Sequence, residues 1–164
     1  MIVSRSDPEE RKTIYDLLPK KYHTFRNVGR LDYQSQGALL LTNDGDLINK
    51  LTHPKHHVEK VYHIKLSSHP DEKQLQRLAR GVILDGVRTL PASMKLVEKS
   101  MTSAILEMVL TEGRNRQVRR MCEAVGLTVK ELRRVSIGPV KLGKLRSGAY
   151  RLLTSREIKA LKSA

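Results

Sequence analysis

The sequence predicts an α+β fold with a mixed, largely antiparallel sheet and flanking helices. Residues 58–66 alternate between two faces, with Tyr62, Ile64 and Leu66 on the same side, which is typical of a strand with one buried face. A second observation is the hairpin signal over residues 82–90, where two apolar runs flank an Asp-Gly turn. Helices do not alternate regularly with strands, so the repeated β-α-β units of a parallel sheet are not expected.

Caps and turns predict the elements of the first half of the chain. Asp7, followed by a proline and two acids, indicates a helix start, and that helix should end at Leu18 before Pro19. After the strand at 58–66, a helix over 70–80 has acids in its first turn and a terminating Gly81. Between the first helix and the strand at 58–66 we expect a basic connector over 20–26, a core strand over 38–41 and a short helix over 46–51.

The second half is predicted in the same way. Strands are expected over 93–97, 103–111, 128–137 and 150–153, with turns at 138–139 and 141–147. Val118, Met121, Cys122 and Val125 recur at helical spacing, so they should face the core of a helix that Gly126 ends. Thr154 and Glu157 form a capping-box signal for a final helix.

Composition favours a polyanionic partner. The chain has 164 residues, which fits a single domain over 1–164, and 31 Lys and Arg against 17 Asp and Glu give a formal charge of +14. Nucleic acid is the first candidate, and a basic surface kept for solubility is the alternative. No apolar run reaches the roughly 18 to 20 residues of a spanning helix, and no signal peptide is evident. A lone Cys122 fits a reducing cytoplasm.

One loop could carry a reactive group. Asp32 lies between Gly29 and Gly37, with Arg30 two residues before it and a core strand after it. Glycines at both ends permit a tight turn that aims the carboxylate. The alternative is an ordinary turn or capping aspartate, because Asp is common in such positions.

The arginines of the segment 112–121 are not equivalent. Turning 100° per residue from Val118 places Arg116 and Arg120 on the face opposite the core, where they would meet solvent or phosphate. Arg119 falls at the border of the apolar stripe and should be half-buried, where a guanidinium needs a carboxylate partner.

A metal site and a base-stacking surface are two other kinds of site that the sequence allows us to assess. The run His53-Pro54-Lys55-His56-His57 suggests a metal site, but no cysteine is nearby and a basic loop beside RNA explains it as well, so no metal is expected. Aromatic residues are scarce, with five Tyr, one Phe and no Trp, so a surface that stacks successive bases is not expected either.

Three motifs resemble those of the pseudouridine synthases that act on single uridines of ribosomal RNA. Residues 29–45 resemble the signature G-R-L-D followed by G-L-L-L-L-T-N-D-G, with Ser35 in place of the usual Thr and Ala38 in place of Leu. Residues 59–62 resemble E-K-x-Y, and 112–121 resemble E-G-R-N-R-Q-V-R-R-M. Leu132, Arg134, Ile137 and Gly138 fit a further segment, L-x-R-x-x-I-G.

The resemblance implies a function and assigns roles. Asp32 would be the catalytic aspartate, Arg119 the arginine that pairs with it, and Tyr62 the active-site tyrosine beside the target base. Arg30 would fill the space left by the flipped nucleotide or hold its phosphate. The RNA backbone would be bound by further basic residues, namely Lys60, Arg114, Arg116, Arg120 and Arg134.

The resemblance also implies the partners. The substrate would be ribosomal RNA, with a preference for the large subunit, either free or in an assembling particle, and the protein would act as a monomer in the cytoplasm without a cofactor. Relatives commonly carry an N-terminal RNA-binding domain and an opening strand like L-N-K-P-x-G, and this sequence starts after both. It is therefore either truncated or docks through the basic catalytic domain alone.

Two non-enzymatic functions are the alternatives. A non-catalytic RNA-binding or ribosome-assembly protein that retains the fold would explain the charge but would leave Asp32 and Arg119 without a purpose. A ribosomal structural protein would more often show long basic tails than motifs spread over a core.

Overall fold

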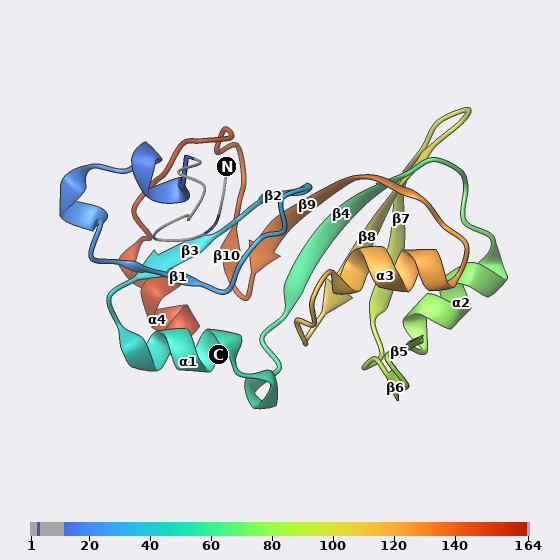
Figure 1. Ribbon diagram of the computed structural model, residues 1–164, viewed down its shortest axis with the longest axis horizontal. Coiled ribbons are helices and arrows are strands. Elements are labelled where there is room, and N and C mark those ends of the chain that lie inside the picture. The colour runs from blue at the N-terminus through green and yellow to red at the C-terminus, as the bar shows by residue number, and fades with distance from the viewer. Residues whose placement is uncertain (1–2, 4–11, 164) are drawn as a thin grey trace.

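The computed structural model describes residues 3 and 12–163 (Figure 1). The strands of this part of the chain are β1 (Arg26–Val28), β2 (Ser35–Gly37), β3 (Leu40–Thr42), β4 (Lys60–Leu66), β5 (Ile83–Leu84), β6 (Val87–Arg88), β7 (Ser93–Lys99), β8 (Ala104–Leu110), β9 (Val129–Ile137) and β10 (Val140–Lys141). The helices are α1 (Gly45–Thr52), α2 (Glu72–Ala79), α3 (Gln117–Ala124) and α4 (Ser155–Ser163), with short 3-10 turns at Ile14–Leu17, Lys20–Tyr22 and Pro54–His56.

The main sheet has six strands, five of them in the order β10-β9-β4-β8-β7. These neighbours pair antiparallel, and β4 is central because it pairs with β8 on one side and with β9 on the other. The sixth strand, β2, pairs parallel with β9, beside Leu132, Arg133 and Arg134. The predicted fold class is therefore confirmed, with one parallel pair added to an otherwise antiparallel sheet.

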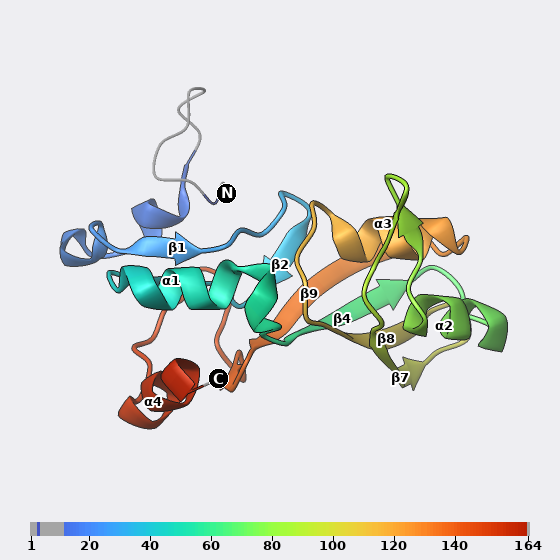
Figure 2. The same ribbon diagram turned by 90° about the horizontal axis from the view of Figure 1, so that it is seen from below.

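The larger hydrophobic core lies between the sheet and helices α2 and α3, which cover the same face (Figure 2). Strand β8 alternates strictly, and its buried positions are Ala104, Leu106, Met108 and Leu110. From α3, the predicted apolar positions Val118, Met121, Cys122 and Val125 are all buried against this face. Burial also raises the pKa of the Cys122 thiol to about 12, so this cysteine is an inert core residue.

A second core joins the first and last parts of the chain. It contains residues of β1, β3, α1 and α4, and it reaches the end of β9 through Ile137. Helix α1 begins at the cap Asp44, whose side chain accepts a hydrogen bond from the Leu47 amide, and it buries Leu47 and Leu51. The long strand β9 thus connects the two cores, through Leu132 in the larger core and Ile137 in the second. Figure 1 shows β1, β3, α1 and α4 at one end of the molecule and α2, α3, β7 and β8 at the other.

Several local predictions were wrong. Residues 150–153 form no strand, because Arg151 instead makes ion-paired hydrogen bonds to Glu157 in front of α4. The connector predicted over 20–26 contains a 3-10 turn and leads into β1, and the loop after Asp32 contains β2. The predicted helix start at Asp7 lies outside the described residues, and within them Thr13 caps the first 3-10 turn.

Gly37 is the residue at which β2 can approach β9 closely. Its φ is +116°, and a Cβ atom placed there would lie 2.1 Å from the backbone oxygen of Arg134. We therefore expect Gly37→Ala to lower the free energy of unfolding by about 3 kcal/mol or more, as measured by urea denaturation.

Gly45→Ala is the matched control. A Cβ at Gly45 would meet no atom within 4 Å, and the residue lies in the first turn of α1. Its effect should remain within about 1 kcal/mol. Equal effects of the two substitutions would contradict the close-approach argument.

Candidate active site

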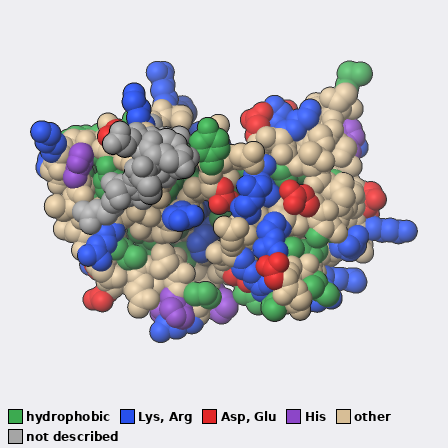
Figure 3. Space-filling model, viewed as in Figure 1, with side chains coloured by type: hydrophobic (Ala, Val, Ile, Leu, Met, Phe, Trp, Pro, Cys, Tyr) green, Lys and Arg blue, Asp and Glu red, His purple; other side chains and the backbone are tan. Residues whose placement is uncertain are grey.

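A cavity of about 240 Å³ lies where the β1–β2 loop, β4, β9 and the N-terminal end of α3 meet. Seven of the nine residues predicted for the site line it, namely Arg30, Asp32, Lys60, Tyr62, Arg114, Arg116 and Arg134. Arg119 and Arg120 do not. Five Lys and Arg side chains against two carboxylates make the cavity lining cationic overall. Lys and Arg side chains, with some acidic ones among them, also gather across the middle of the face shown in Figure 3.

Asp32 immediately precedes a tight turn that is held at several points. The Ser35 amide donates to the carbonyl oxygen of Asp32 at 2.8 Å, which closes the turn over Tyr33 and Gln34. From Ser35 onward the chain pairs with β9 as β2. The carboxylate is thus held next to the central strands of the sheet, and Tyr33 is left 84% exposed beside it.

Arg119 contributes to this turn in an unexpected way. Its Nη2 donates to the carbonyl oxygen of Gln34 at 2.6 Å, and its Nη1 donates to that of Val129 at 3.2 Å. Within residues 12–163 no ion pair joins Arg119 to Asp32, so the pairing expected from the sequence is not formed. Arg119 is also buried, whereas the sequence predicted a half-buried side chain at the edge of the apolar face of the helix. The reason is that α3 packs against β9. It fastens the backbone of the Asp32 turn to α3 and β9.

Arg134 is the buried guanidinium among those that line the cavity. It is only 5% exposed, whereas the sequence suggested an RNA-backbone contact at the surface. Its Nε donates to the carbonyl oxygen of Ala38 at 2.8 Å, and its Nη1 donates to that of Arg30 at 3.4 Å. Its Nη2 is buried and has no hydrogen-bond partner. A buried, unpaired cationic donor is costly to maintain, so it is available for a negatively charged or carbonyl oxygen in the cavity.

Lys60 adds a second positive charge, which is half-buried, and its Nζ donates to the carbonyl oxygen of Val58 at 3.0 Å. Desolvation lowers the pKa of Lys60, and the nearby charge of Arg134 lowers it further. Two cations that repel each other at the bottom of a cavity are stabilised when an anion enters. The electrostatics of the site therefore favour a phosphate or a carboxylate.

Tyr62 has the position expected from the strand pattern. It lies on β4 between Met108 of β8 and Arg134 of β9, packs partly against the larger core and lines the cavity. Its ring can therefore contact a planar group bound beside Asp32.

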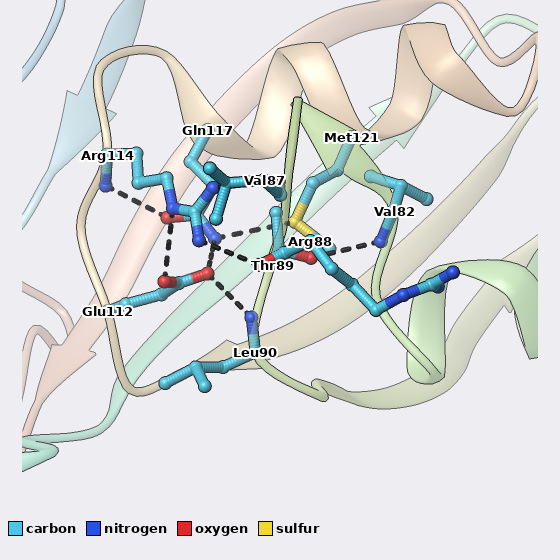
Figure 4. A network of polar contacts seen from close by, with 9 residues as sticks. All are labelled: Val82, Val87, Arg88, Thr89, Leu90, Glu112, Arg114, Gln117 and Met121. Carbon is cyan, nitrogen blue, oxygen red and sulfur yellow. Dashed lines mark hydrogen bonds and ion pairs between the residues drawn. The ribbon is translucent and has the colours of Figure 1, made fainter. Parts of the chain in front are cut away.

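Arg114 is engaged with protein groups. Its Nε donates to the Glu112 carboxylate at 3.3 Å, while its two terminal nitrogens donate to the carbonyl oxygens of Val87 and Arg88 (Figure 4). Arg120 is likewise engaged, in an ion pair with Asp85 at the β5–β6 turn. Both side chains thus make contacts within the protein, and the phosphate contacts expected of them stay predictions.

Two arginines keep the exposure that the sequence predicts. Arg116 is exposed, adopts a left-handed conformation with φ of +48° and forms the N-cap position of α3. Arg30 is exposed at the cavity rim, directly before the Asp32 turn. Both can reach RNA phosphates without breaking a contact described for their side chains.

Comparisons with known proteins decide the family. Residues 1–124 match the family described as RNA pseudouridylate synthase. The chain belongs to this family. The sequence is 39% identical over 165 residues to the ribosomal large subunit pseudouridine synthase B of Bacillus subtilis, covering 99% of this chain and 68% of that protein. It is also 39% identical to the ribosomal large subunit pseudouridine synthase E of Xanthomonas campestris, covering 94% of this chain and 89% of that protein.

Solved structures agree. A crystal structure of a pseudouridylate synthase superposes with a TM-score of 0.89 at 35% sequence identity, over 98% of this chain and 68% of that chain. The family resemblance inferred from the sequence motifs is therefore confirmed.

Sequence reasoning missed three site residues of this synthase. The Ser35 hydroxyl lines the cavity and is buried without a hydrogen-bond partner, so it can bind a substrate oxygen or amide. Glu112 and Gln117 are buried and hydrogen-bonded to each other. The signal for Ser35 was present, because the family motif has a hydroxyl residue at this position; Glu112 and Gln117 gave no signal of burial.

The structure offers no metal site in the part of the chain that it describes. No group of three or more His, Cys, Asp or Glu side chains is placed to hold an ion there. His53 and His56 stack edge to face on an exposed loop. None of the helices among these residues is both long and apolar enough to cross a membrane.

We expect Arg119→Met to reduce turnover of this synthase by about 10- to 100-fold, since a displaced Asp32 turn loses its alignment with the cavity. Unfolding should also require about 1–3 kcal/mol less free energy, because two backbone carbonyls lose their donor. Single-turnover kinetics and urea denaturation would measure the two effects. The matched variant Arg120→Met should mainly weaken RNA binding. Loss of binding in Arg119→Met together with loss of turnover in Arg120→Met would contradict the roles given to these two arginines.

Lys60→Met should raise the melting temperature at neutral pH, because it removes a charge that burial and Arg134 disfavour. The gain should shrink as pH rises through the lowered pKa of Lys60, where the lysine is already neutral in the folded state. RNA affinity should fall about fivefold. Calorimetry and filter binding test this, with the exposed Lys130→Met as control. If Lys60→Met lowers the melting temperature while Lys130→Met does not, the charge of Lys60 does not destabilise the folded protein.

Proposed function

We propose that this chain converts a specific uridine of ribosomal RNA to pseudouridine, with Asp32 as the catalytic group and a large-subunit uridine as the target. One observation carries the assignment of Asp32. The cavity contains two carboxylates, and the Glu112 oxygens accept hydrogen bonds from Leu90, Gln117 and Arg114. The Asp32 side chain accepts none from any described residue, so it alone is free to act on a substrate.

The reaction suits such a group. Isomerisation breaks the bond between C1′ of the ribose and N1 of uracil and forms one between C1′ and C5. The C5 proton is lost and N1 gains one, so the composition of the nucleotide does not change and no co-reactant is required. A carboxylate can attack the sugar or stabilise its developing positive charge, or it can attack the base.

The cavity dimensions support base flipping. Its volume admits one base and excludes a paired helix, so the uridine must leave its stack, at a cost of a few kcal/mol. Tyr62 would then contact the flipped uracil, and Arg30 at the rim would occupy the vacated space or hold the flanking phosphate. Arg116 would bind the backbone nearby.

The positive charge that supports Asp32 would come from Arg134. This guanidinium lines the same cavity and has a free buried Nη2, whereas both terminal nitrogens of Arg119 donate to carbonyl oxygens. Arg134 would attract the Asp32 carboxylate or bind a uracil oxygen. Arg119 would act as a positioning residue through the turn.

The partner follows from the relatives and from charge. The Bacillus subtilis and Xanthomonas campestris relatives described above are both named ribosomal large subunit pseudouridine synthases. A formal charge of +14 matches a polyanion, and RNA affinity should fall steeply with salt. We propose that a monomer of the catalytic domain engages this RNA, free or in an assembling subunit.

We expect Asp32→Asn to abolish pseudouridine formation while RNA binding stays within about twofold of wild type, because the amide keeps the shape but cannot act as a nucleophile. Pseudouridine would be mapped on ribosomal RNA by carbodiimide-induced stops of reverse transcription. Asp46→Asn, an exposed residue in the first turn of α1, is the charge-matched control.

Turnover by Asp32→Asn would overturn the catalytic assignment. Binding without turnover by the wild-type chain, on ribosomal RNA from cells that lack the gene, would favour the non-catalytic RNA-binding alternative. The position of the modified uridine in such RNA also tests the large-subunit assignment.

A further inference from the structure

The β5–β6 hairpin lies beside the cavity and has no role in the chemistry described above. It consists of two paired two-residue strands joined by a tight turn in which Asp85 and Gly86 have positive φ. A hairpin of this length is not stable alone in water. Its conformation must therefore be imposed by the rest of the molecule.

The anchors of the hairpin come from the segment that lines the cavity. Arg114 donates to the carbonyl oxygens of Val87 at 3.1 Å and Arg88 at 2.8 Å, while the Leu90 amide donates to Glu112 at 3.0 Å (Figure 4). Glu112 in turn binds Arg114 and the buried Gln117 at the start of α3. The hairpin is thereby fixed relative to the cavity wall.

Two further contacts complete the attachment. The side chain of Thr89 is buried and accepts a hydrogen bond from the Val82 amide at 3.1 Å. At the turn, Arg120 of α3 forms an ion pair with Asp85, which holds the pKa of that carboxyl below its usual value. The only acid of the hairpin is thus neutralised on a surface that faces a polyanion.

The clamped hairpin exposes large apolar side chains. Ile83 is 60% exposed, Val87 59% and Leu90 38%, whereas the neighbouring Leu84 is buried. Apolar groups on a rigid element next to a cationic site are typical of a contact surface. An extruded uridine leaves unstacked bases on either side of it, and their faces and riboses are apolar surfaces that such side chains can cover.

We propose that Val87 and Leu90, which follow one another on the second strand of the hairpin and its exit, form a contact surface for the RNA strand that flanks the target uridine, held in place by Glu112, Arg114 and Arg120. Ile83 pairs with Arg88 and so lies on the other face of the hairpin. The proposal rests on the proposed function and extends it. The E-G-R-N-R-Q-V-R-R-M segment then has two tasks. Its free arginine, Arg116, meets phosphate, and its engaged arginines position an apolar wall.

Val87→Asp should weaken binding to a ribosomal RNA fragment about tenfold, because it replaces an apolar contact with a charge that repels RNA. Met101→Asp is the matched control. Met101 is 97% exposed at the β7–β8 turn, so the substitution makes the same charge change away from the cavity. It should change affinity less than twofold. Val87→Ser and Met101→Ser repeat the comparison without charge, and melting temperatures confirm folding of all variants.

A photoreactive benzoylphenylalanine at position 87 or 101 of the full chain gives a readout independent of turnover. Crosslinks from position 87 to nucleotides next to the modified uridine, and none from position 101, would support the proposal. Equal effects of the paired substitutions, or crosslinks from position 87 only to protein or to a second copy of the chain, would overturn it. Failure of the proposed function would appear separately, as RNA crosslinks without any pseudouridine formed by the wild-type chain.

Discussion

The parallel pairing of β2 with β9 is the interaction on which the site depends. It joins a short segment after Asp32 to the longest strand of the sheet, and the absence of a side chain at Gly37 permits the close approach. Arg134 then reaches from β9 to the carbonyl oxygens of Ala38 and Arg30, on both sides of the turn. Without this pairing the carboxylate would sit on an unsupported loop, and its distance from Tyr62 on β4 would not be fixed.

Arginine side chains act as connectors in this molecule more than as surface charges. Arg119 and Arg134 are buried and donate to backbone carbonyls, while Arg114 and Arg120 bind the β5–β6 hairpin. A planar guanidinium with five donors can satisfy several carbonyls at fixed angles, which a lysine cannot do. The positive potential of the cavity is therefore produced by groups that also determine its shape.

The buried polar atoms that lack partners mark where the substrate is expected. Among the described residues these are Ser35 Oγ, Arg119 Nε and Arg134 Nη2, and two of the three belong to residues that line the cavity. Unsatisfied buried groups are rare because each costs free energy. Together with the lowered pKa of Lys60, they indicate a site that is stabilised when RNA binds.

The sequence by itself determined the fold class, the family, the cationic character of the surface and seven of the residues that line the cavity. These properties follow from local patterns: the alternation around Tyr62, the helical spacing from Val118 to Val125, and motifs that stay contiguous in the chain. The tertiary structure alone decided which arginine meets which oxygen. Helical periodicity placed Arg119 near the core correctly, but it could not show that the turn would present the carbonyl of Gln34 to it and not the carboxylate of Asp32. Such pairings depend on how a loop and a helix about 85 residues apart in the chain pack together, and no pattern within either segment encodes that distance.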